Sequence, residues 1–381
     1  MFRFGTVVAA VLLTATANAA VAQSFAYPQA KHGRGELRYI NGVPVLMVAG
    51  NPEEIGEQMG LLAMKPAVKG VNLVEDLLKE QGIGYLRPLL AQLGNGLLTK
   101  FPQDYRTEME AAAKASGIRR DLLVIANTMH DVRRLTGCST LLVDPARSKT
   151  GAPLVGRNLD FSFVNGTHQY SLVTVYRPNG KKAFAAVSFP GATVVGCAMS
   201  AINADGLVFG QNDVGKAADN SRSMELGNTP TAVIARRVLE ECSTVADAER
   251  LLRSVKPAGR SIFFACDRDG GAIFEVTPNT IVVRREPGGV CPATNQFETK
   301  ELAVNPNCKR AAILAHARDI KTFDIAEVAK AMHQVHQGKR TAHTVVFEPR
   351  TLTMHLAFGD GVQSATAFPL HEVRLAELLR K

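Results

Sequence analysis

A cysteine, an arginine and an aspartate lie in two neighbouring apolar runs that a turn containing Pro and Gly separates. Cys138 follows Gly137 at the junction between a helical pattern and a strand pattern, and Arg157 and Asp160 belong to the second run, VGRNLDF. If the two runs pair as a hairpin, Arg157 and Asp160 return to the side of Cys138. A cation beside a thiol lowers its pKa and favours the nucleophilic thiolate, whereas a carboxylate can hold an amine. These residue types therefore indicate a cysteine nucleophile.

The same three residues also have a purely structural explanation. A cysteine is often a small buried hydrophobic residue, and Arg157 and Asp160 could form an ion pair near the turn. Side chains three residues apart point to opposite faces of a regular strand, unless a bulge or the strand end re-aims one of them. The spacing alone therefore leaves the roles of Arg157 and Asp160 open.

The patterns around this hairpin predict an α+β fold. Asn41-Gly42 separates two β-like runs between residues 33 and 50, and this dipeptide suits a tight hairpin turn. We expect helices that start near residue 51 and over residues 72–80, 85–98, 104–116, 120–135, 230–254, 309–320 and 324–336. We expect strands from residue 138 onward, over residues 170–176, 183–189, 193–201, 206–212, 261–266, 271–276 and 280–285, with a last hairpin around residues 350–351. Antiparallel hairpins with helices between them favour a layered α+β domain over a doubly wound parallel sheet.

Composition excludes several classes of protein. The chain has 381 residues, of which 46% are hydrophobic and 21% charged, so it is long and apolar enough for a globular core. Its net charge of +9 is spread along the chain, because Lys and Arg never occur in runs longer than two. This distribution argues against a nucleic-acid partner. The sequence also lacks the Gly-rich nucleotide motifs, and we expect no cofactor. It lacks the G-x-S-x-G motif of a serine nucleophile as well.

Residues 1–22 are typical of a signal peptide. Arg3 precedes an apolar run over residues 7–13, and the segment ends in the small-residue site Ala20-Val21-Ala22. A second such site would place the cut after Ala19 instead. The apolar run is too short for a membrane anchor. We therefore expect a secreted or periplasmic protein with no stable membrane anchor.

The cysteine and histidine spacings do not predict a metal site. Six cysteines, at positions 138, 197, 242, 266, 291 and 308, include no C-x-x-C pair. If Cys138 stays a free thiol, the other five form at most two disulfides, which persist in an oxidising compartment. His333 and His336 have a helical spacing, but no Cys or acidic residue lies at a typical ligand interval from them. A solvated helix face explains the two histidines better than zinc does.

A papain-like mechanism is an alternative use of the same cysteine. It would combine Cys138 with His343 or His355 and with Asn295. Papain-like enzymes place the histidine before the asparagine, whereas Asn295 comes first here. A second alternative is a catalytically silent ligand-binding protein of the cell envelope, which keeps the fold without the chemistry.

Seven segments resemble, in order, the isopenicillin N acyltransferase-like family of cysteine N-terminal nucleophile hydrolases. They are NPEEIGEQMG (51–60), YRTEMEAAAKASGI with DLLVIAN (105–127), GCST (137–140), GRNLDF (156–161), INADGL (202–207), TNQF (294–297) and CKR (308–310). GRNLDF is also similar to the related bile-salt (choloylglycine) hydrolases and acid ceramidase-like amidases. The resemblance spans most of the chain from about residue 33.

The resemblance implies a four-layer αββα fold made as a precursor that cuts itself between Gly137 and Cys138. A mostly helical pro-part, residues 23–137, would then remain bound as an α chain beside a β chain of residues 138–381. The cut exposes an α-amino group on Cys138, whose ordinary pKa of about 7.7 to 8.0 suits a base at neutral pH. One residue would then supply both the nucleophile and the base.

The resemblance also implies roles for other residues. Asp160 would bind the new α-amino group, and Arg157 would support the thiolate and position substrate. Asn295 would donate its side-chain N–H to the oxyanion of the tetrahedral intermediate, and Arg310 would brace the site. A second oxyanion donor falls near residues 211–213 (Gln-Asn-Asp), among which Asn212 is the candidate and Gln211 and Asp213 compete with it.

These features together predict an exported, self-processing cysteine amidase or acyltransferase. The substrate would be a small molecule with a linear amide bond, an N-acyl amide or a β-lactam relative, or an ester. The substrate would acylate Cys138, and water or an acceptor amine would release the acyl group. The sequence does not identify the substrate.

Overall fold

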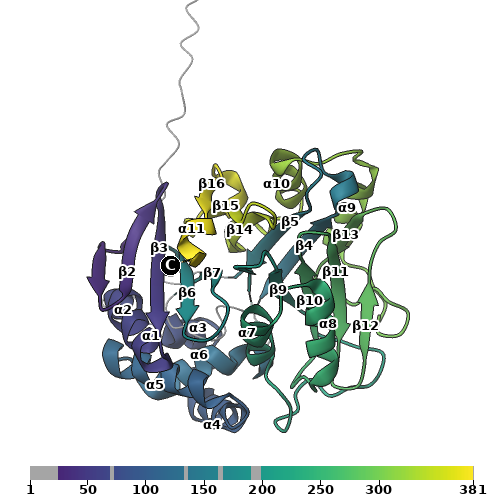
Figure 1. Ribbon diagram of the computed structural model, residues 1–381. Coiled ribbons are helices and arrows are strands. Elements are labelled where there is room, and N and C mark those ends of the chain that lie inside the picture. Colours follow the sequence, from purple (N-terminus) through teal and green to yellow (C-terminus); the bar gives the residue numbers. More distant parts are fainter. Residues whose placement is uncertain (1–24, 69–72, 133–135, 162–165, 190–198, 381) are drawn as a thin grey trace, which may run out of the picture.

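The computed structural model describes residues 25–68, 73–132, 136–161, 166–189 and 199–380. The predicted signal peptide and Cys197 therefore lie outside the described residues. The described part contains two β-sheets and flanking helices, which confirms the α+β class (Figure 1).

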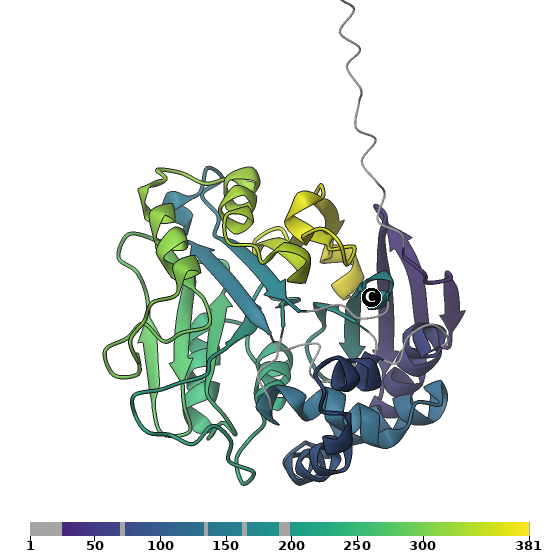
Figure 2. The ribbon, with the colours of Figure 1, turned by 180° about the vertical axis from the view of Figure 1, so that it is seen from behind.

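The larger sheet has ten strands, and the pairing is antiparallel except between β3 and β6. In spatial order its strands are β1 (Ala30–His32), β2 (Gly35–Ile40), β3 (Val43–Gly50), β6 (Leu172–Pro178), β7 (Phe184–Ser188), β8 (Ala201–Asn203), β9 (Val208–Asp213), β10 (Ser261–Cys266), β11 (Gly271–Val276) and β12 (Ile281–Arg284). Strands from before and after Cys138 thus share one sheet. Figure 2 shows β1 to β3 and β10 to β12 at opposite ends of the molecule.

The smaller sheet has six antiparallel strands and carries Cys138. In spatial order they are β13 (Val290–Ala293), β4 (Gly137–Val143), β5 (Leu154–Asp160), β14 (Thr341–Glu348), β15 (Thr353–Phe358) and β16 (His371–Arg374). The sequence patterns did not predict β13 or β16. Both are short, and β13 contains a proline, which weakens the strand pattern.

The helices fall before β4 or after β9. They are α1 (Pro52–Met59), α2 (Lys65–Val68), α3 (Leu73–Glu80), α4 (Arg87–Leu98), α5 (Gln103–Ser116), α6 (Arg120–Val132), α7 (Thr231–Glu241), α8 (Val245–Ser254), α9 (Lys309–Ala315), α10 (Ile325–His333) and α11 (Ala376–Arg380). The helical pattern predicted over residues 230–254 corresponds to two helices. Thr244 forms a capping box with Asp247 and so begins α8 as a separate helix after α7 ends.

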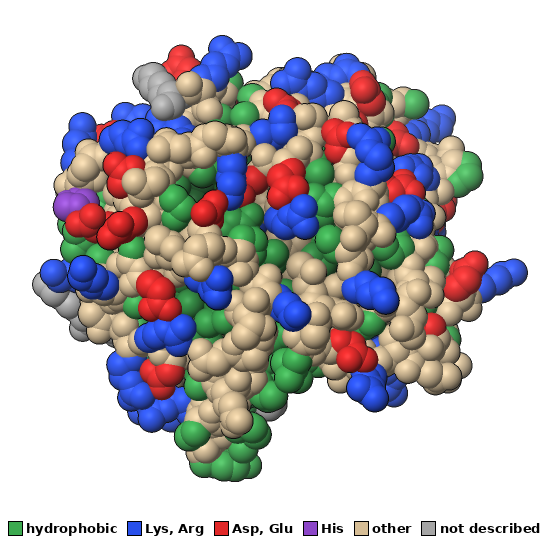
Figure 3. Space-filling view, turned by 60° about the horizontal axis from the view of Figure 1, so that its bottom comes forward, with side chains coloured by type: hydrophobic (Ala, Val, Ile, Leu, Met, Phe, Trp, Pro, Cys, Tyr) green, Lys and Arg blue, Asp and Glu red, His purple; other side chains and the backbone are tan. Residues whose placement is uncertain are grey.

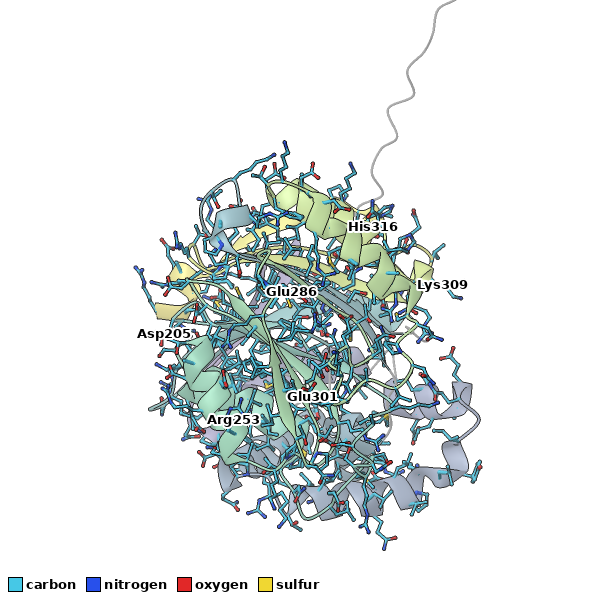
Figure 4. The ribbon with its side chains drawn as sticks, turned by 90° about the vertical axis from the view of Figure 1, so that its right-hand side faces the viewer. Asp205, Arg253, Glu286, Glu301, Lys309 and His316 are labelled. Atoms are coloured by element: carbon cyan, nitrogen blue, oxygen red, sulfur yellow. The ribbon has the colours of Figure 1, made fainter. Side chains whose placement is uncertain are left out.

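Three apolar clusters divide the molecule into the four predicted layers. Alternate residues of a strand face opposite sides. Accordingly, Leu142 of β4 packs between the two sheets, whereas Leu141 packs on the outer face of the smaller sheet, with α10. A third cluster joins the outer face of the larger sheet to helices that include α1, α5, α7 and α8. Figure 4 shows α9, marked by Lys309 and His316, on the other side of the sheets from α8, marked by Arg253.

Four further expectations concern a turn, the thiols, membrane-spanning helices and charge. Asn41 and Gly42, both with positive φ (48° and 82°), form the predicted turn between β2 and β3. The cysteines at 138, 242, 266, 291 and 308, which are those the structure describes, are all free thiols. Over the described residues, no helix is both long and apolar enough to cross a bilayer. Figure 3 shows Lys and Arg interspersed with Asp and Glu over one face, as the charge pattern predicts.

Candidate active site

The β4–β5 hairpin brings the predicted residues together. Gly137 pairs with Asp160, Cys138 with Leu159, and Thr140 with Arg157. The register is continuous, so Arg157 and Asp160 do lie on opposite faces of β5. Arg157 points between the two sheets with the Cys138 side chain, whereas the Asp160 carboxylate meets residues of the outer helical layer.

The Cys138 thiol is buried beside a guanidinium group. Arg157 Nη2 lies 3.2 Å from Cys138 Sγ, and the cysteine has no exposed surface. Burial raises the pKa of the thiol above its ordinary value, while the Arg157 charge lowers it and the carboxylates of Asp213 and Asp160 raise it. The arginine therefore acts in the expected direction, but burial is the larger effect. In the uncut chain the cysteine is a protonated thiol.

Arg157 is held rigidly at the thiol. Its guanidinium donates to Asn212 Oδ1 at 2.6 Å and to the carbonyl oxygens of Gln211 at 2.6 Å and Met199 at 3.0 Å. It also lies 5.3 Å from the centre of the Phe264 ring. These contacts satisfy a cation that has no exposed surface, and they fix its distance from Sγ.

The structure separates the three candidates at residues 211–213. Asn212 faces the inter-sheet space, where its Oδ1 accepts from Arg157 and its Nδ2 donates to the Thr294 carbonyl at 3.0 Å. Asn212 thus holds Arg157. Gln211 contributes its carbonyl oxygen, and Asp213 contacts the residues just before Cys138.

Asp160 accepts hydrogen bonds from three side chains. Gln337 Nε2 donates to Oδ2 at 2.6 Å, Thr341 Oγ1 donates to Oδ1 at 2.6 Å, and Arg310 Nη1 lies 3.2 Å from Oδ2. The carboxylate has no exposed surface and lies beside Gly137: a Cβ added to that glycine would be 3.2 Å from Oδ2. Asp160 is therefore a fixed anionic group next to the peptide bond that precedes Cys138.

Arg310 and Asn295 lie over the backbone of Cys138. Arg310 Nη1 donates to the Cys138 carbonyl oxygen at 2.9 Å, and its Nη2 donates to Asn295 Oδ1 at 2.7 Å. The same Oδ1 accepts from the Cys138 amide nitrogen at 2.7 Å, while Nδ2 donates to the Asp213 carbonyl at 2.8 Å. In this structure Asn295 therefore presents its oxygen to Cys138, and one of the two N–H groups of its amide donates to Asp213.

A group that sequence reasoning missed lies beside the thiol. Cys138 Sγ donates to Thr136 Oγ1 at 3.8 Å, and Thr136 donates its hydroxyl to Asp213 Oδ2 at 2.7 Å and its amide to the same oxygen at 3.1 Å. His130 Nε2 of α6 lies 2.9 Å from Asp213 Oδ1. Asp213 was predicted only as a competing candidate for the second oxyanion donor. No pattern in the sequence around His130 indicates its contact with Asp213.

The histidines of the alternative mechanisms lie elsewhere. His343 Nε2 contacts Ser200 Oγ at 2.9 Å, and Arg157 stands between Ser200 and the thiol. His355 pairs with Glu348 at 2.8 Å, on strands away from Cys138. The structure therefore does not place either histidine on the thiol as a papain-like site requires.

His333 and His336 have different partners. His333 Nδ1 contacts Thr366 Oγ1 at 3.0 Å, and His336 Nδ1 accepts from the Gly338 amide at 2.9 Å. The described residues include no group of three His, Cys, Asp or Glu side chains arranged to hold a metal ion.

Part of the chain matches a family model. Residues 146–318 match the model described as acyl-coenzyme A:6-aminopenicillanic acid acyl-transferase. The predicted family resemblance is confirmed over this segment. The matched segment holds Arg157, Asp160, Asn295 and Arg310 and begins after Cys138. No curated protein sequence is significantly similar to the chain.

Several solved structures are distantly similar in fold. A variant of conjugated bile acid hydrolase from Clostridium perfringens is 13% identical, over 63% of this chain and 93% of that chain, with a TM-score of 0.45. An N-acylethanolamine-hydrolyzing acid amidase orthologue from Caenorhabditis elegans is 15% identical, over 56% and 93%, with a TM-score of 0.44. Penicillin V acylase from Agrobacterium tumefaciens is 13% identical, over 58% and 83%, with a TM-score of 0.40.

Proposed function

We propose that this protein is an exported cysteine amidase or acyltransferase that cuts its own chain between Gly137 and Cys138. Cys138 then attacks a carbon–nitrogen bond other than a peptide bond in a small-molecule substrate. The acyl group passes to the sulfur and is released by water or by an acceptor amine. The observation that carries this proposal is the set of polar groups around residue 138: a cation at its thiol and an amide oxygen at its nitrogen.

The surroundings of Gly137 support the cut. A Cβ at this position would lie 2.3 Å from Gln337 Nε2 and 3.1 Å from Asp160 Cβ, so a residue larger than glycine would displace the group that holds Asp160. Gly137 has no positive φ, so crowding, and not backbone strain, explains the glycine. An unhindered carbonyl favours attack by the neighbouring thiol.

Cutting would convert the Cys138 nitrogen from an amide into an amine. Asn295 Oδ1 already accepts from that nitrogen, and Asp160 lies on the Gly137 side of it. These acceptors would stabilise the ammonium form that arises when the amine takes the proton of a reacting thiol. Arg157 would then stabilise the thiolate, since an ionised sulfur gains more from the adjacent cation than a neutral one.

Export favours hydrolysis over acyl transfer. If residues 1–22 direct the chain out of the cytoplasm, with a cut after Ala22 or Ala19, acyl-coenzyme A is absent there and water is the acceptor. The partners are then a small-molecule amide or ester and, within each molecule, the α chain (residues 23–137) and the β chain (residues 138–381). The matched family and the similar solved structures, which include an acyl-transferase, an acid amidase and an acylase, support this class of substrate.

The test is the mass and N-terminal sequence of the denatured chains after purification from the native compartment. We expect two chains, the larger beginning at Cys138, and a Cys138→Ala variant that stays in one piece. Turnover of a panel of N-acyl amides, penicillins and esters by the cut protein, and not by Cys138→Ala, identifies the substrate. An uncut wild-type chain that turns over these compounds would show instead that Cys138 acts without self-processing. An uncut chain with no activity would favour the binding protein.

A further inference from the structure

The first cut needs a proton acceptor that the mature enzyme does not need. In the mature enzyme of the proposed function, the α-amino group of Cys138 takes the thiol proton. Before the cut that nitrogen is an amide, which is not basic, and it donates to Asn295 Oδ1. The buried thiol of Cys138, whose pKa burial raises, must therefore lose its proton to a different group.

The neighbours of Cys138 Sγ leave one described route for this proton. Arg157 Nη2, 3.2 Å away, is a cationic donor and cannot accept. Asp160 is on the other face of β5 and already accepts from Gln337, Thr341 and Arg310. The thiol donates instead to Thr136 Oγ1, at 3.8 Å.

Thr136 leads directly to a buried carboxylate. Its hydroxyl donates to Asp213 Oδ2 at 2.7 Å, so it can pass one proton on as it receives another. Burial alone would raise the pKa of Asp213, but His130 and the hydrogen bonds from Thr136 outweigh burial and hold the pKa below its ordinary value. The carboxylate is therefore ionised and free to accept, with His130 Nε2 fixed 2.9 Å from its second oxygen.

We propose that Thr136 and Asp213, held by His130, form a proton relay that serves the self-cleavage step; this inference rests on the proposed function. The sulfur bonds to the Gly137 carbonyl carbon while its proton moves to Thr136 Oγ1, the Thr136 hydroxyl proton moves to Asp213 Oδ2, and the carbonyl electron pair becomes an oxyanion. When the intermediate collapses, the C–N bond breaks and the proton returns through Thr136 to the Cys138 nitrogen. Water then hydrolyses the thioester, which leaves a Gly137 carboxylic acid and regenerates the Cys138 thiol.

The residues of the relay come from both sides of the Gly137–Cys138 bond. His130 and Thr136 belong to the part before Gly137, whereas Asp213 ends β9 in the part after Cys138. The two hydrogen bonds from Thr136 to Asp213 fix the residue just before Gly137 against the larger sheet. The cut turns Gly137 into a free chain end and gives Cys138 its own base, so the relay serves only the precursor.

The experiment follows self-cleavage of the full-length chain made by cell-free synthesis, sampled over time and measured by intact mass after denaturation. Thr136→Val keeps the shape but removes the hydroxyl, and Asp213→Asn keeps an acceptor for Thr136 but cannot take a proton in the same way. We expect each to slow the cut by about 100-fold, the lower range for general acid–base catalysis. Thr136→Ser restores the hydroxyl and should cut at close to the wild-type rate.

The matched control is Thr174→Val. Thr174 is a buried threonine of β6 whose hydroxyl contacts Ser188 Oγ at 3.1 Å, so the same substitution there removes a threonine hydrogen bond away from Cys138. If Thr136→Val cuts as fast as Thr174→Val, or Thr136→Ser as slowly as Thr136→Val, the relay is wrong even though the proposed function stands. If the wild-type chain itself stays whole, the proposed self-processing fails first. Far-UV circular dichroism and thermal unfolding of each variant confirm that a slow chain is folded.

Discussion

Replacing Gly137 by alanine tests how closely the site is packed around the scissile bond. The new Cβ would lie 2.3 Å from Gln337 Nε2, well inside contact distance, so the Gln337 amide must move. That amide donates to Asp160 Oδ2 at 2.6 Å, and the bond is lost when it moves. Hydrogen bonds to charged groups contribute about 1.5 to 3 kcal/mol. If the lost hydrogen bond raises the activation free energy of self-cleavage by this amount, the rate drops by about 10- to 100-fold, since about 1.4 kcal/mol corresponds to a factor of ten.

The assay is the time course of cutting in cell-free synthesis, with Gly227→Ala as the matched control. A Cβ at Gly227 meets no atom within 4 Å, and the residue has no positive φ, so the same substitution there adds a methyl group in open space. A double variant, Gly137→Ala with Gln337→Ala, has no clash but also lacks the hydrogen bond from Gln337 to Asp160. It should therefore fold as stably as Gln337→Ala alone and cut no faster than Gln337→Ala. Cutting of Gly137→Ala at the rate of Gly227→Ala would refute the crowding argument.

Three further changes test separate parts of the structure. Asp160→Asn should lower turnover far more than the unfolding free energy, because an amide can keep hydrogen-bonded contacts but cannot neutralise the ammonium group proposed on Cys138. Steady-state kinetics and urea unfolding measure the two effects, and an equal fall in turnover and in unfolding free energy would contradict the prediction. Burial lowers the pKa of His343 to about 3. As the pH falls below 6.5, the unfolded chain therefore takes up a proton that the folded chain does not, and the unfolding free energy drops by about 1.4 kcal/mol per pH unit in that window. His343→Gln should flatten this part of the curve of unfolding free energy against pH, and an unchanged slope would contradict the assignment. Glu108→Ala should lower the unfolding free energy by about 1.5 to 3 kcal/mol, because the buried guanidinium of Arg236 loses the carboxylate that it contacts at 2.7 and 2.6 Å but keeps Glu240 at 2.9 Å. The exposed Glu241→Ala is the control in the same urea titration of the uncut Cys138→Ala chain, and equal losses would argue against a buried ion pair.

The sequence predicts the β4–β5 hairpin because local rules determine it. Two apolar runs that residues 144–153 connect are close enough in sequence to pair as neighbours, and alternation then places Arg157 and Asp160 on opposite faces. The same alternation places Asn212 on one face of β9 and its neighbours Gln211 and Asp213 on the other. The sequence does not indicate which of these faces meets Arg157, because that depends on how strands far apart in the chain are arranged in the sheets.

The His130–Asp213 contact could not be read from the sequence for a related reason. His130 lies in α6, and nothing in that helix requires a carboxylate partner from β9. The contact arises because α6 packs on the outer face of the larger sheet, where alternate residues of β9 also point. A tertiary arrangement of this kind leaves no short-range pattern, whereas the contiguous pair Gly137-Cys138 was a candidate from the sequence alone.

The contacts of Asn295 bear on how the uncut chain would differ from the proposed catalyst. Its Oδ1 accepts from the Cys138 nitrogen and from Arg310, and one N–H of its Nδ2 donates to the Asp213 carbonyl. Since Nδ2 carries two hydrogens, the second N–H is the one that would donate to an oxyanion in the proposed mechanism. The Asp213 side chain is held in turn by Thr136. In the proposed function, cutting after Gly137 would separate Thr136 from Cys138 and so loosen the support of Asp213. Because the Asp213 carbonyl accepts from Asn295, the same cut would also relax the contact that orients the proposed oxyanion donor.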